Sequence, residues 1–157
     1  MADQEHPSLL RLVRPPLTSA FDDIYDALGG KHDGCSIPAS ADRAITLRQL
    51  RAVYAHIERR CVAEKWCNVQ GEILTPEQVL LYDASRYVIK PMTEARSCSL
   101  VELVARAPQR PMWFVSHWWG QPLLEFLRCL EQHAEDHGLG EDTAYWVRAA
   151  KGSTCRA

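Results

Sequence analysis

The spacing of hydrophobic positions predicts a long amphipathic helix in the first half of the chain. From position 46 onward, apolar residues recur at steps of three and four, which places them on one face of a helix. The helix is expected to begin at Thr46, because Thr46 and Gln49 fit a capping box, in which each side chain satisfies the other residue's free backbone N–H. Its apolar positions are Leu47, Leu50, Tyr54, Ile57 and Cys61.

Three shorter helices are predicted around this one. A helix around residues 20–28 carries apolar side chains at helical spacing. The run Thr75-Pro76-Glu77-Gln78 predicts the start of another, with threonine as the cap and proline in the first turn, and Pro91 is expected to stop or kink it. A capping box at residues 99–102 opens the last of the three.

The pattern changes in the last third of the chain. Residues 112–117 form a compact apolar and aromatic run, which is typical of a buried strand. A turn at 118–121 leads into a helix with a broad apolar face, for which Pro122 suits the first position and Gly138 the end. Residues 144–149 predict a second strand. Because a helix joins the two strands, we expect them to be parallel and the connection to be right-handed.

These elements predict a mixed α/β chain in which a helical region precedes an incomplete parallel β-α-β unit. We divide the chain into a weakly ordered segment 1–44, a helical region 45–107, the start of an α/β domain at 108–150 and a tail 151–157. A two-stranded parallel sheet leaves its edges and much apolar surface open. We therefore expect the chain to end early inside a larger domain, as a fragment, a truncated gene model or a true short form, and to self-associate or bind a protein partner.

Composition narrows the range of partners. A length of 157 residues is enough for one ordinary domain, and a net charge of -2 gives no reason to expect nucleic acid as a partner. No stretch is long and apolar enough to span a bilayer, and the polar start does not resemble a secretory signal. We therefore expect a cytoplasmic protein whose six cysteines are reduced thiols.

The main candidate site is the step from the first strand to the following helix, where ligands commonly bind in α/β sheets. Its candidate ligand-binding residues are Ser116, His117, Trp118, Trp119 and Gly120. The tryptophans can stack on a ring, and the histidine can bind phosphate or act as an acid or base. The alternative is that the tryptophans pack on the sheet and the histidine is structural. Ser116 and His117 are not expected to form a nucleophile–base pair, because adjacent strand residues point to opposite faces.

Other residues with metal-binding or reactive side chains give weaker signals. Cys129, His133 and His137 lie four residues apart on one helix, so the two histidines can fill two corners of a metal site. Ala134 stands where a His-Glu-x-x-His metalloprotease needs glutamate, and we therefore predict no metal but a solvated helix end. Cys98 lies at a helix start, where a thiol has either a lowered pKa or a buried structural position.

A series of short motifs runs in order through residues 75–149. They are Leu80-Leu81-Tyr82-Asp83, Tyr87-Val88-Ile89-Lys90-Pro91, Thr93-Glu94-Ala95-Arg96, Val101-Glu102-Leu103, Trp113-Phe114-Val115-Ser116-His117-Trp118-Trp119-Gly120, Glu131-Gln132-His133-Ala134 and Tyr145-Trp146-Val147. This series resembles a family of uncharacterised proteins that is abundant in single-celled marine algae such as dinoflagellates and haptophytes. The resemblance covers about half of the chain and implies no established activity.

The strand–helix–strand opening is also similar to the start of Toll-receptor-like (TIR-type) domains, which have a flavodoxin-like parallel sheet. Some TIR domains cleave NAD with a glutamate on a later helix, and that region has no counterpart here, so no catalytic residue and no cofactor are expected. The resemblance implies a signalling or protein-interaction module with a partial TIR-like domain. The alternative is a nucleotide- or NAD-processing enzyme, with NAD as cofactor, that uses a pocket at residues 116–120.

Overall fold

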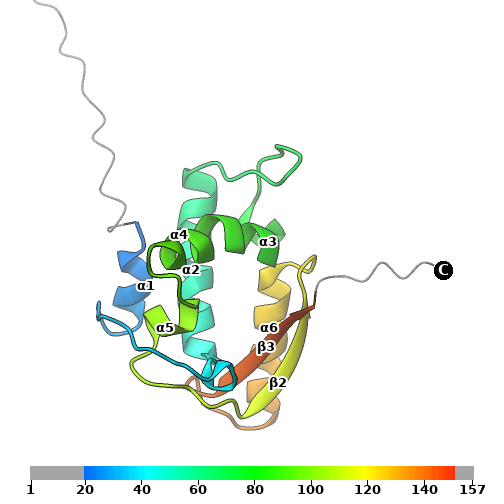
Figure 1. Cartoon of the computed structure of the whole chain (residues 1–157). Coiled ribbons are helices and arrows are strands. Elements are labelled where there is room, and N and C mark those ends of the chain that lie inside the picture. Colours follow the sequence, from blue (N-terminus) through cyan, green and yellow to red (C-terminus); the bar gives the residue numbers. More distant parts are fainter. Residues whose placement is uncertain (1–19, 151–157) are drawn as a thin grey trace, which may run out of the picture.

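Helices pack against one small mixed sheet in the computed structural model, which describes residues 20–150 and their side chains through Arg148 (Figure 1). This architecture confirms the predicted α/β class. The α-helices are α1 (Asp22–Ala27), α2 (Leu47–Ala63), α3 (Leu81–Ala84), α4 (Lys90–Thr93), α5 (Leu100–Val104) and α6 (Leu123–Asp136). The strands are β1 (Ile45–Thr46), β2 (Trp113–Trp118) and β3 (Ala144–Ala150). Short 3-10 turns cover Ser40–Asp42, Pro76–Gln78 and Glu94–Arg96, and a π-helical turn covers Ser85–Ile89.

Helix α2 begins as the sequence predicts. The Thr46 hydroxyl accepts a hydrogen bond from the Gln49 N–H at 3.2 Å, and the Gln49 side-chain oxygen accepts one from the Thr46 N–H at 3.0 Å. The first two N–H groups of the helix donate to the loop before β3, from Leu47 to the Thr143 carbonyl and from Arg48 to the Glu141 carbonyl. All five predicted apolar positions of α2 are buried, and they form one stripe along the helix.

The sheet has the strand order β1-β3-β2. Strands β2 and β3 are parallel, with a continuous register from Trp113 opposite Tyr145 to Trp118 opposite Ala150, as predicted. The prediction of only two strands was wrong, because β1 pairs antiparallel with β3 through Ile45 and Thr46. A strand of two residues is too short to show the alternation by which strands are recognised in a sequence.

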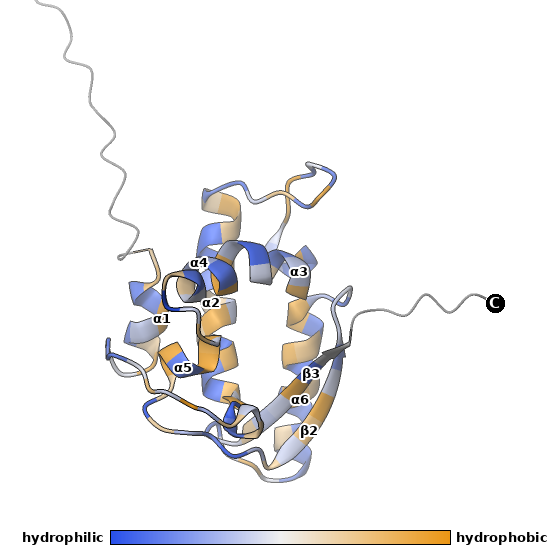
Figure 2. Ribbon diagram, in the orientation of Figure 1, coloured by the Kyte–Doolittle hydropathy of each residue, from blue (hydrophilic) through white to orange (hydrophobic). Residues whose placement is uncertain are grey.

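The two faces of the sheet differ in what covers them. The inner face carries Trp113, Val115, His117, Tyr145 and Val147, and α6 packs against it. We call the opposite face, which carries Phe114, Ser116, Trp118, Trp146 and Arg148, the outer face. The 3-10 turn at Ser40–Asp42 reaches this face, where the Trp146 indole N–H donates to the Ser40 carbonyl at 3.2 Å. In Figure 2 the helices show both hydrophobic and hydrophilic residues, as expected of elements that bury one side.

The segment from Thr75 to Pro91 differs from the single helix that the sequence predicts. Its first turn is a capped 3-10 turn, and the chain then becomes extended at Val79 and Leu80. The Val79 carbonyl accepts the N–H of Leu123, and Leu80 forms an isolated bridge with Pro122, so both residues are used to hold the start of α6. The helix resumes at Leu81 and continues past Pro91, which it accommodates after the π-helical turn.

One hydrophobic core joins the helices to the sheet. The cluster includes Ile24 of α1, Leu50 of α2, Phe126 of α6 and Tyr145 of β3. The predicted boundaries between the segments 1–44, 45–107 and 108–150 stay a prediction, and residues 1–19 and 151–157 lie outside the described part of the chain. Among the described residues, no helix has both the length and the apolar character needed to cross a membrane.

Salt bridges connect α2 to α6 and to the loop that follows it. The Arg51 guanidinium lies 2.7 Å from a Glu131 carboxylate oxygen of α6 and 2.6 Å from a Glu141 carboxylate oxygen. Arg48 lies 3.0 Å from the Asp142 carboxylate. These side chains are partly exposed, so each pair contributes little stability by itself. Their arrangement nevertheless fixes the orientation of α2 against α6.

Replacing Thr46 with Ala removes one half of the capping box of α2. We expect Thr46→Ala to lower the free energy of unfolding by about 1 kcal/mol, because one N–H at the start of the helix loses its acceptor. Urea unfolding followed by circular dichroism measures the change. Thr46→Ser keeps the hydroxyl and is the control; an equal loss in both variants would show that the methyl group, and not the cap, matters here.

Candidate functional site

The predicted site lies where β2 ends and α6 begins. Strand β2 extends to Trp118, the Gln121 N–H donates to the Trp118 carbonyl at 3.0 Å, and Pro122 is the residue that caps α6. Pro122 thus lies one position before the place that the sequence predicts. The extended residues at the start of α3 hold this turn from the other side, through the bonds of Val79 and Leu80 described above.

Ser116 and His117 point to opposite faces of β2. Ser116 lies exposed on the outer face, whereas His117 lies on the inner face and is 1% exposed. The two side chains therefore cannot act together on one substrate. This arrangement follows directly from the alternation of side chains along a strand.

His117 is buried without a hydrogen-bond partner. Its ring stacks on Phe126 of α6, with 4.1 Å between ring centroids, and neither of its ring nitrogens has a partner within the described residues. Burial lowers the pKa of His117 from its ordinary value of 6.5, and the side chain of Gln121 opposes this shift only in part. The imidazole is therefore neutral at pH 7 and is shielded from any molecule on the surface.

The two tryptophans of the turn have different environments. Trp118 is 58% exposed on the outer face, and its indole folds over Gly120 so closely that a Cβ at Gly120 would lie 2.5 Å from the ring. Trp119 instead packs against Tyr82 of α3, with ring centroids 4.9 Å apart, and its buried indole N–H has no partner within the described residues. Glycine at position 120 thus leaves room for the indole, and a larger residue there would displace the exposed Trp118 side chain.

A cavity at another place in the fold was not expected from the sequence. It has a volume of about 770 Å³, and its lining includes Cys35, Cys98, Arg43, Arg96 and Glu102. Glu102 accepts hydrogen bonds from the backbone of Ser99 and Ile37, and these bonds lower its pKa to about 2. Since its carboxylate is already paired with these donors and with Arg43, Glu102 holds two loops together rather than offering a free acid or base.

The histidines of α6 do not form a metal site with other described residues. His133 and His137 stack on each other at 4.3 Å, and Trp113 of β2 packs edge-on against both rings. The Nδ1 atom of His133 lies 3.3 Å from the Tyr145 hydroxyl, and that of His137 donates to the His133 carbonyl. Between residues 20 and 150, no group of three or more His, Cys, Asp or Glu side chains could hold a metal ion. Cys129 is exposed on α6.

A partly buried cluster between α1 and α2, in which Asp23 pairs with Arg59 and hydrogen-bonds to His56, was missed by sequence reasoning. Nδ1 of His56 lies 2.8 Å from the Asp23 carboxylate, which also binds the Arg59 guanidinium at 2.7 Å. Burial lowers the pKa of His56, whereas the pKa of Asp23 is held down by hydrogen bonds from Arg59 and His56 in spite of its own burial. No spacing rule links positions 33 residues apart in two different helices, so the sequence gives no signal for this pair.

Acidification should destabilise the protein in part through His117. Because the folded state has the lower pKa, the unfolded chain binds a proton near pH 6.5 that the folded protein does not, and the free energy of unfolding falls as the pH drops. Each pKa unit of depression corresponds to about 1.4 kcal/mol. We expect His117→Phe, which keeps an aromatic ring against Phe126, to lose less stability than the natural protein between about pH 8 and about pH 5.

The measurement is chemical unfolding at a series of pH values. His56 titrates in the same direction in both proteins, so its contribution cancels in the comparison. Equal loss of stability in the two proteins would contradict a depressed pKa at His117.

Placing a methyl group at Gly120 should move Trp118. We expect Gly120→Ala to displace the exposed indole into solvent and shift the tryptophan fluorescence to longer wavelength, while stability changes by less than about 1 kcal/mol. Gly140→Ala is a matched control, since a Cβ there meets no atom within 4 Å. An unchanged emission spectrum for Gly120→Ala would contradict the close contact between Trp118 and Gly120.

Comparison of the chain with protein-family models, with curated proteins and with solved structures found no match. The resemblances inferred from sequence motifs therefore stay predictions. What the chain does has to be argued from the surfaces and side chains described above.

Proposed function

We propose that the chain is a cytoplasmic signalling or protein-interaction module whose partial TIR-like α/β unit binds a protein through the open side of its sheet. The observation that carries this proposal is the outer face of β2. Phe114 is 75% exposed and Trp118 is 58% exposed on that face, and the neighbouring Met112 is 66% exposed. Large aromatic side chains of this kind are the residues that most often supply binding energy at protein interfaces.

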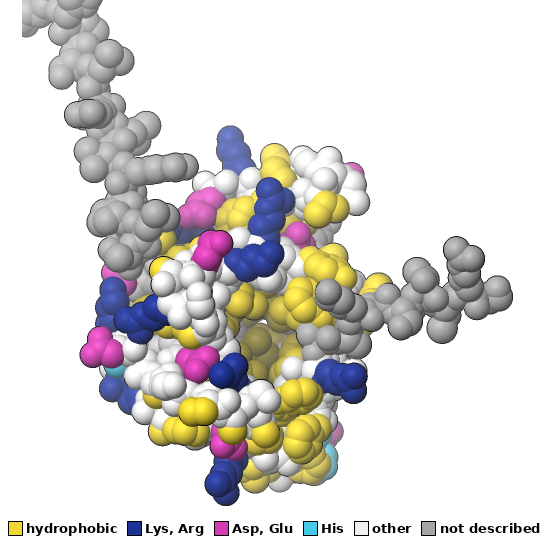
Figure 3. Space-filling view, in the orientation of Figure 1, with side chains coloured by type: hydrophobic (Ala, Val, Ile, Leu, Met, Phe, Trp, Pro, Cys, Tyr) yellow, Lys and Arg dark blue, Asp and Glu magenta, His cyan; other side chains and the backbone are white. Residues whose placement is uncertain are grey.

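The surroundings of these residues support a protein as the binding partner. Figure 3 shows hydrophobic side chains gathered over the sheet, with a hollow between them and the helices beside it. Ser116, between the two aromatic residues on the outer face, is small and exposed, and Arg148 is exposed on β3. An apolar centre with polar residues at its rim is the usual composition of a protein interface.

Removing the two exposed aromatic side chains tests this proposal. We expect the double variant Phe114→Ser, Trp118→Ser to capture its protein partner from an extract of the source organism at least about tenfold less well than the natural chain. Neither side chain is in the buried core, so circular dichroism and urea unfolding should show a folded protein of similar stability. Quantitative mass spectrometry of the captured proteins measures the difference.

A matched control separates this patch from general surface hydrophobicity. Val69→Ser, Ile73→Ser removes two apolar side chains that are 82% and 65% exposed in the turn after α2. This variant should capture the same proteins as the natural chain. Identical capture by all three proteins would rule out the outer face as the binding surface.

A second candidate function is a nucleotide- or NAD-processing enzyme. The observation in its favour is the group of buried polar atoms without partners at the β2–α6 turn, namely both ring nitrogens of His117 and the indole nitrogen of Trp119. Unpaired buried groups of this kind often mark binding sites. Binding there requires the turn to open, because His117 is 1% exposed.

Addition of NAD distinguishes this second function from the first. The enzyme function predicts turnover of NAD or saturable quenching of tryptophan fluorescence, both of which His117→Ala should abolish while the protein stays folded. If His117 is purely structural, NAD has no effect, and His117→Ala only lowers the free energy of unfolding, by about 1–3 kcal/mol through the cavity that it leaves.

A further inference from the structure

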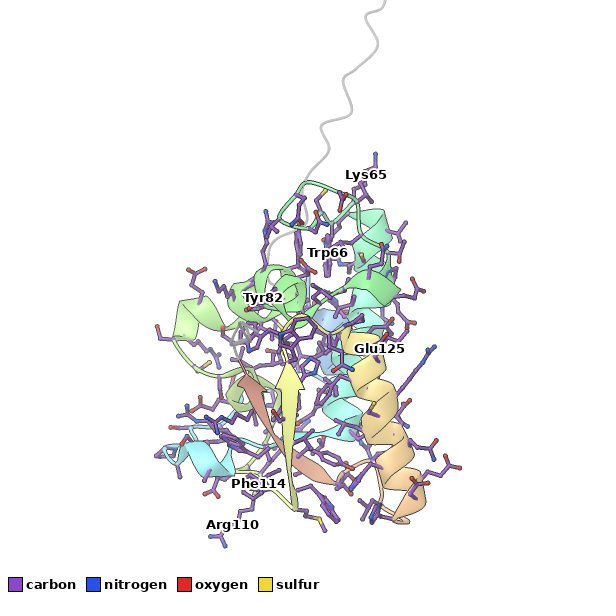
Figure 4. The ribbon with its side chains drawn as sticks, turned by 90° about the vertical axis from the view of Figure 1, so that its right-hand side faces the viewer. Lys65, Trp66, Tyr82, Arg110, Phe114 and Glu125 are labelled. Carbon is purple, nitrogen blue, oxygen red and sulfur yellow. The ribbon has the colours of Figure 1, made fainter. Side chains whose placement is uncertain are left out.

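Within residues 20–150, no strand pairs with the edge of β2 that faces away from β3. The order β1-β3-β2 makes β2 an edge strand over its whole length, from Trp113 to Trp118. In Figure 4, β2 lies at the front of the molecule and runs between Phe114 and the turn near Tyr82, with α6 beside it. An unpaired strand edge exposes a row of N–H and C=O groups that can bind another strand.

The register of the sheet identifies which backbone groups point outward. The Met112 N–H, just before the strand, donates to the Ala144 carbonyl, so the backbone groups of Ala144 and of alternate residues after it face β2, whereas those of Tyr145 face β1. In a parallel ladder, only one member of each opposite pair directs its N–H and C=O groups at the other strand. Because Trp113 lies opposite Tyr145, the backbone groups of Trp113, Val115 and His117 face β3, and those of Phe114, Ser116 and Trp118 face the free edge. Of these edge groups, the Trp118 carbonyl already accepts the Gln121 N–H.

The edge lacks the features that normally prevent strand pairing. Natural edge strands are usually protected by charged side chains, by a bulge or by a covering element. Residues 111–124 contain no charged side chain, and the ladder with β3 is continuous, without a bulge. The prolines at 111 and 122 lie outside the strand and leave all six of its residues free to pair.

We propose that two copies of the chain form a symmetric dimer in which their β2 strands pair antiparallel, with Ser116 on the twofold axis. This proposal rests on the open sheet of the proposed function and names a second copy as the partner. The pairing places Ser116 opposite Ser116 of the second copy and Phe114 opposite Trp118. Every outward-facing group of one strand then meets an outward-facing group of the other, and two three-stranded sheets become one continuous sheet.

The side chains fit the same register. On the outer face, Phe114 of one copy lies directly opposite Trp118 of the other, and the small Ser116 side chains lie between these aromatic pairs at the axis. The exposed aromatic residues thus cover each other across the axis.

Charge selects the antiparallel direction. Arg110 is exposed before β2, and Glu125 is exposed in the first turn of α6, near opposite ends of the strand (Figure 4). Antiparallel pairing brings Arg110 of one copy to the end that carries Glu125 of the other, whereas parallel pairing would place like charges together. An unrelated extended peptide would not in general carry the opposite charge at each of its two ends.

Hydrogen exchange of the full chain, followed residue by residue by NMR, tests the dimer without a mutation. Sedimentation should show a dimer that forms as the concentration rises. The amide protons of Phe114, Ser116 and Trp118 should become protected over the same concentration range, while those of Val115 and His117 are protected throughout by β3. A monomer at all concentrations, or a dimer whose protection appears elsewhere, would overturn the proposal.

Two variants test the edge directly. Ser116→Pro removes an N–H that faces only the free edge and should weaken the dimer at least about tenfold without breaking the ladder with β3. Ser116→Lys places like charges at the axis and should also weaken it, whereas Val69→Lys, on a distant turn, should not. Unchanged dimerisation in a folded Ser116→Pro or Ser116→Lys variant would exclude this edge.

The outcome for the dimer is separable from that for the proposed function. If the chain is monomeric but the Phe114→Ser, Trp118→Ser variant still loses its captured partner, the interaction function holds with a different protein on the sheet. Alternatively, the dimer forms as described while the natural chain and the Phe114→Ser, Trp118→Ser variant capture the same other proteins. In that case the module acts through self-association alone.

Discussion

Helix α6 lies between the sheet and α2, and this packing is the contact on which the rest of the structure depends. Its buried residues recur at helical spacing, as Leu123, Phe126, Leu127, Leu130 and Ala134. They fill the space under β2 and β3, while Arg51 of α2 binds both Glu131 of α6 and Glu141 of the following loop. A two-stranded parallel unit has too little buried surface to be stable without such a neighbour. The helical region and the sheet therefore share one core.

Because α6 packs against one face of the sheet, the two faces differ in how exposed their side chains are. The inner face is covered by α6, and its residues are buried or half-buried apart from Trp113, whereas among residues 20–150 no helix or strand covers the β2 edge. Burial on the inner face leaves the polar atoms of His117 without partners, which costs free energy that a purely structural aromatic residue would not. The outer face keeps large aromatic residues in water instead. Both features lie within β2, which makes this strand the part of the molecule least explained by stability alone.

Much of the secondary structure could be predicted because its signals are local. The capping boxes at Thr46 and Ser99, the left-handed Gly138 after α6 and the apolar run of β2 each act within a few residues. The missed features all depend on contacts between distant residues. Strand β1 exists because it pairs with β3, and the helix after Thr75 is interrupted because Val79 binds the start of α6.

In the candidate site, too, the sequence predicted local features but not the contacts between distant residues. Alternation along the strand was enough to predict that Ser116 and His117 would lie on opposite faces. It could not predict that His117 would be covered by Phe126, or that Trp118 would fold back over Gly120, because these positions are set by packing between elements. The hydrogen bond between His56 and Asp23 is equally invisible in the sequence, since it joins two separate helices.

The contact between the start of α2 and the loop before β3 has a consequence for the order of events during synthesis. The first N–H groups of α2 donate to the carbonyls of Thr143 and Glu141, and Ile45 pairs with Tyr145. A ribosome makes these partners long after α2 itself, and closing so large a loop is entropically costly. On the nascent chain, the start of α2 therefore has its own capping box but not these acceptors, and the pairing of Ile45 with Tyr145 can form only after β3 has been made.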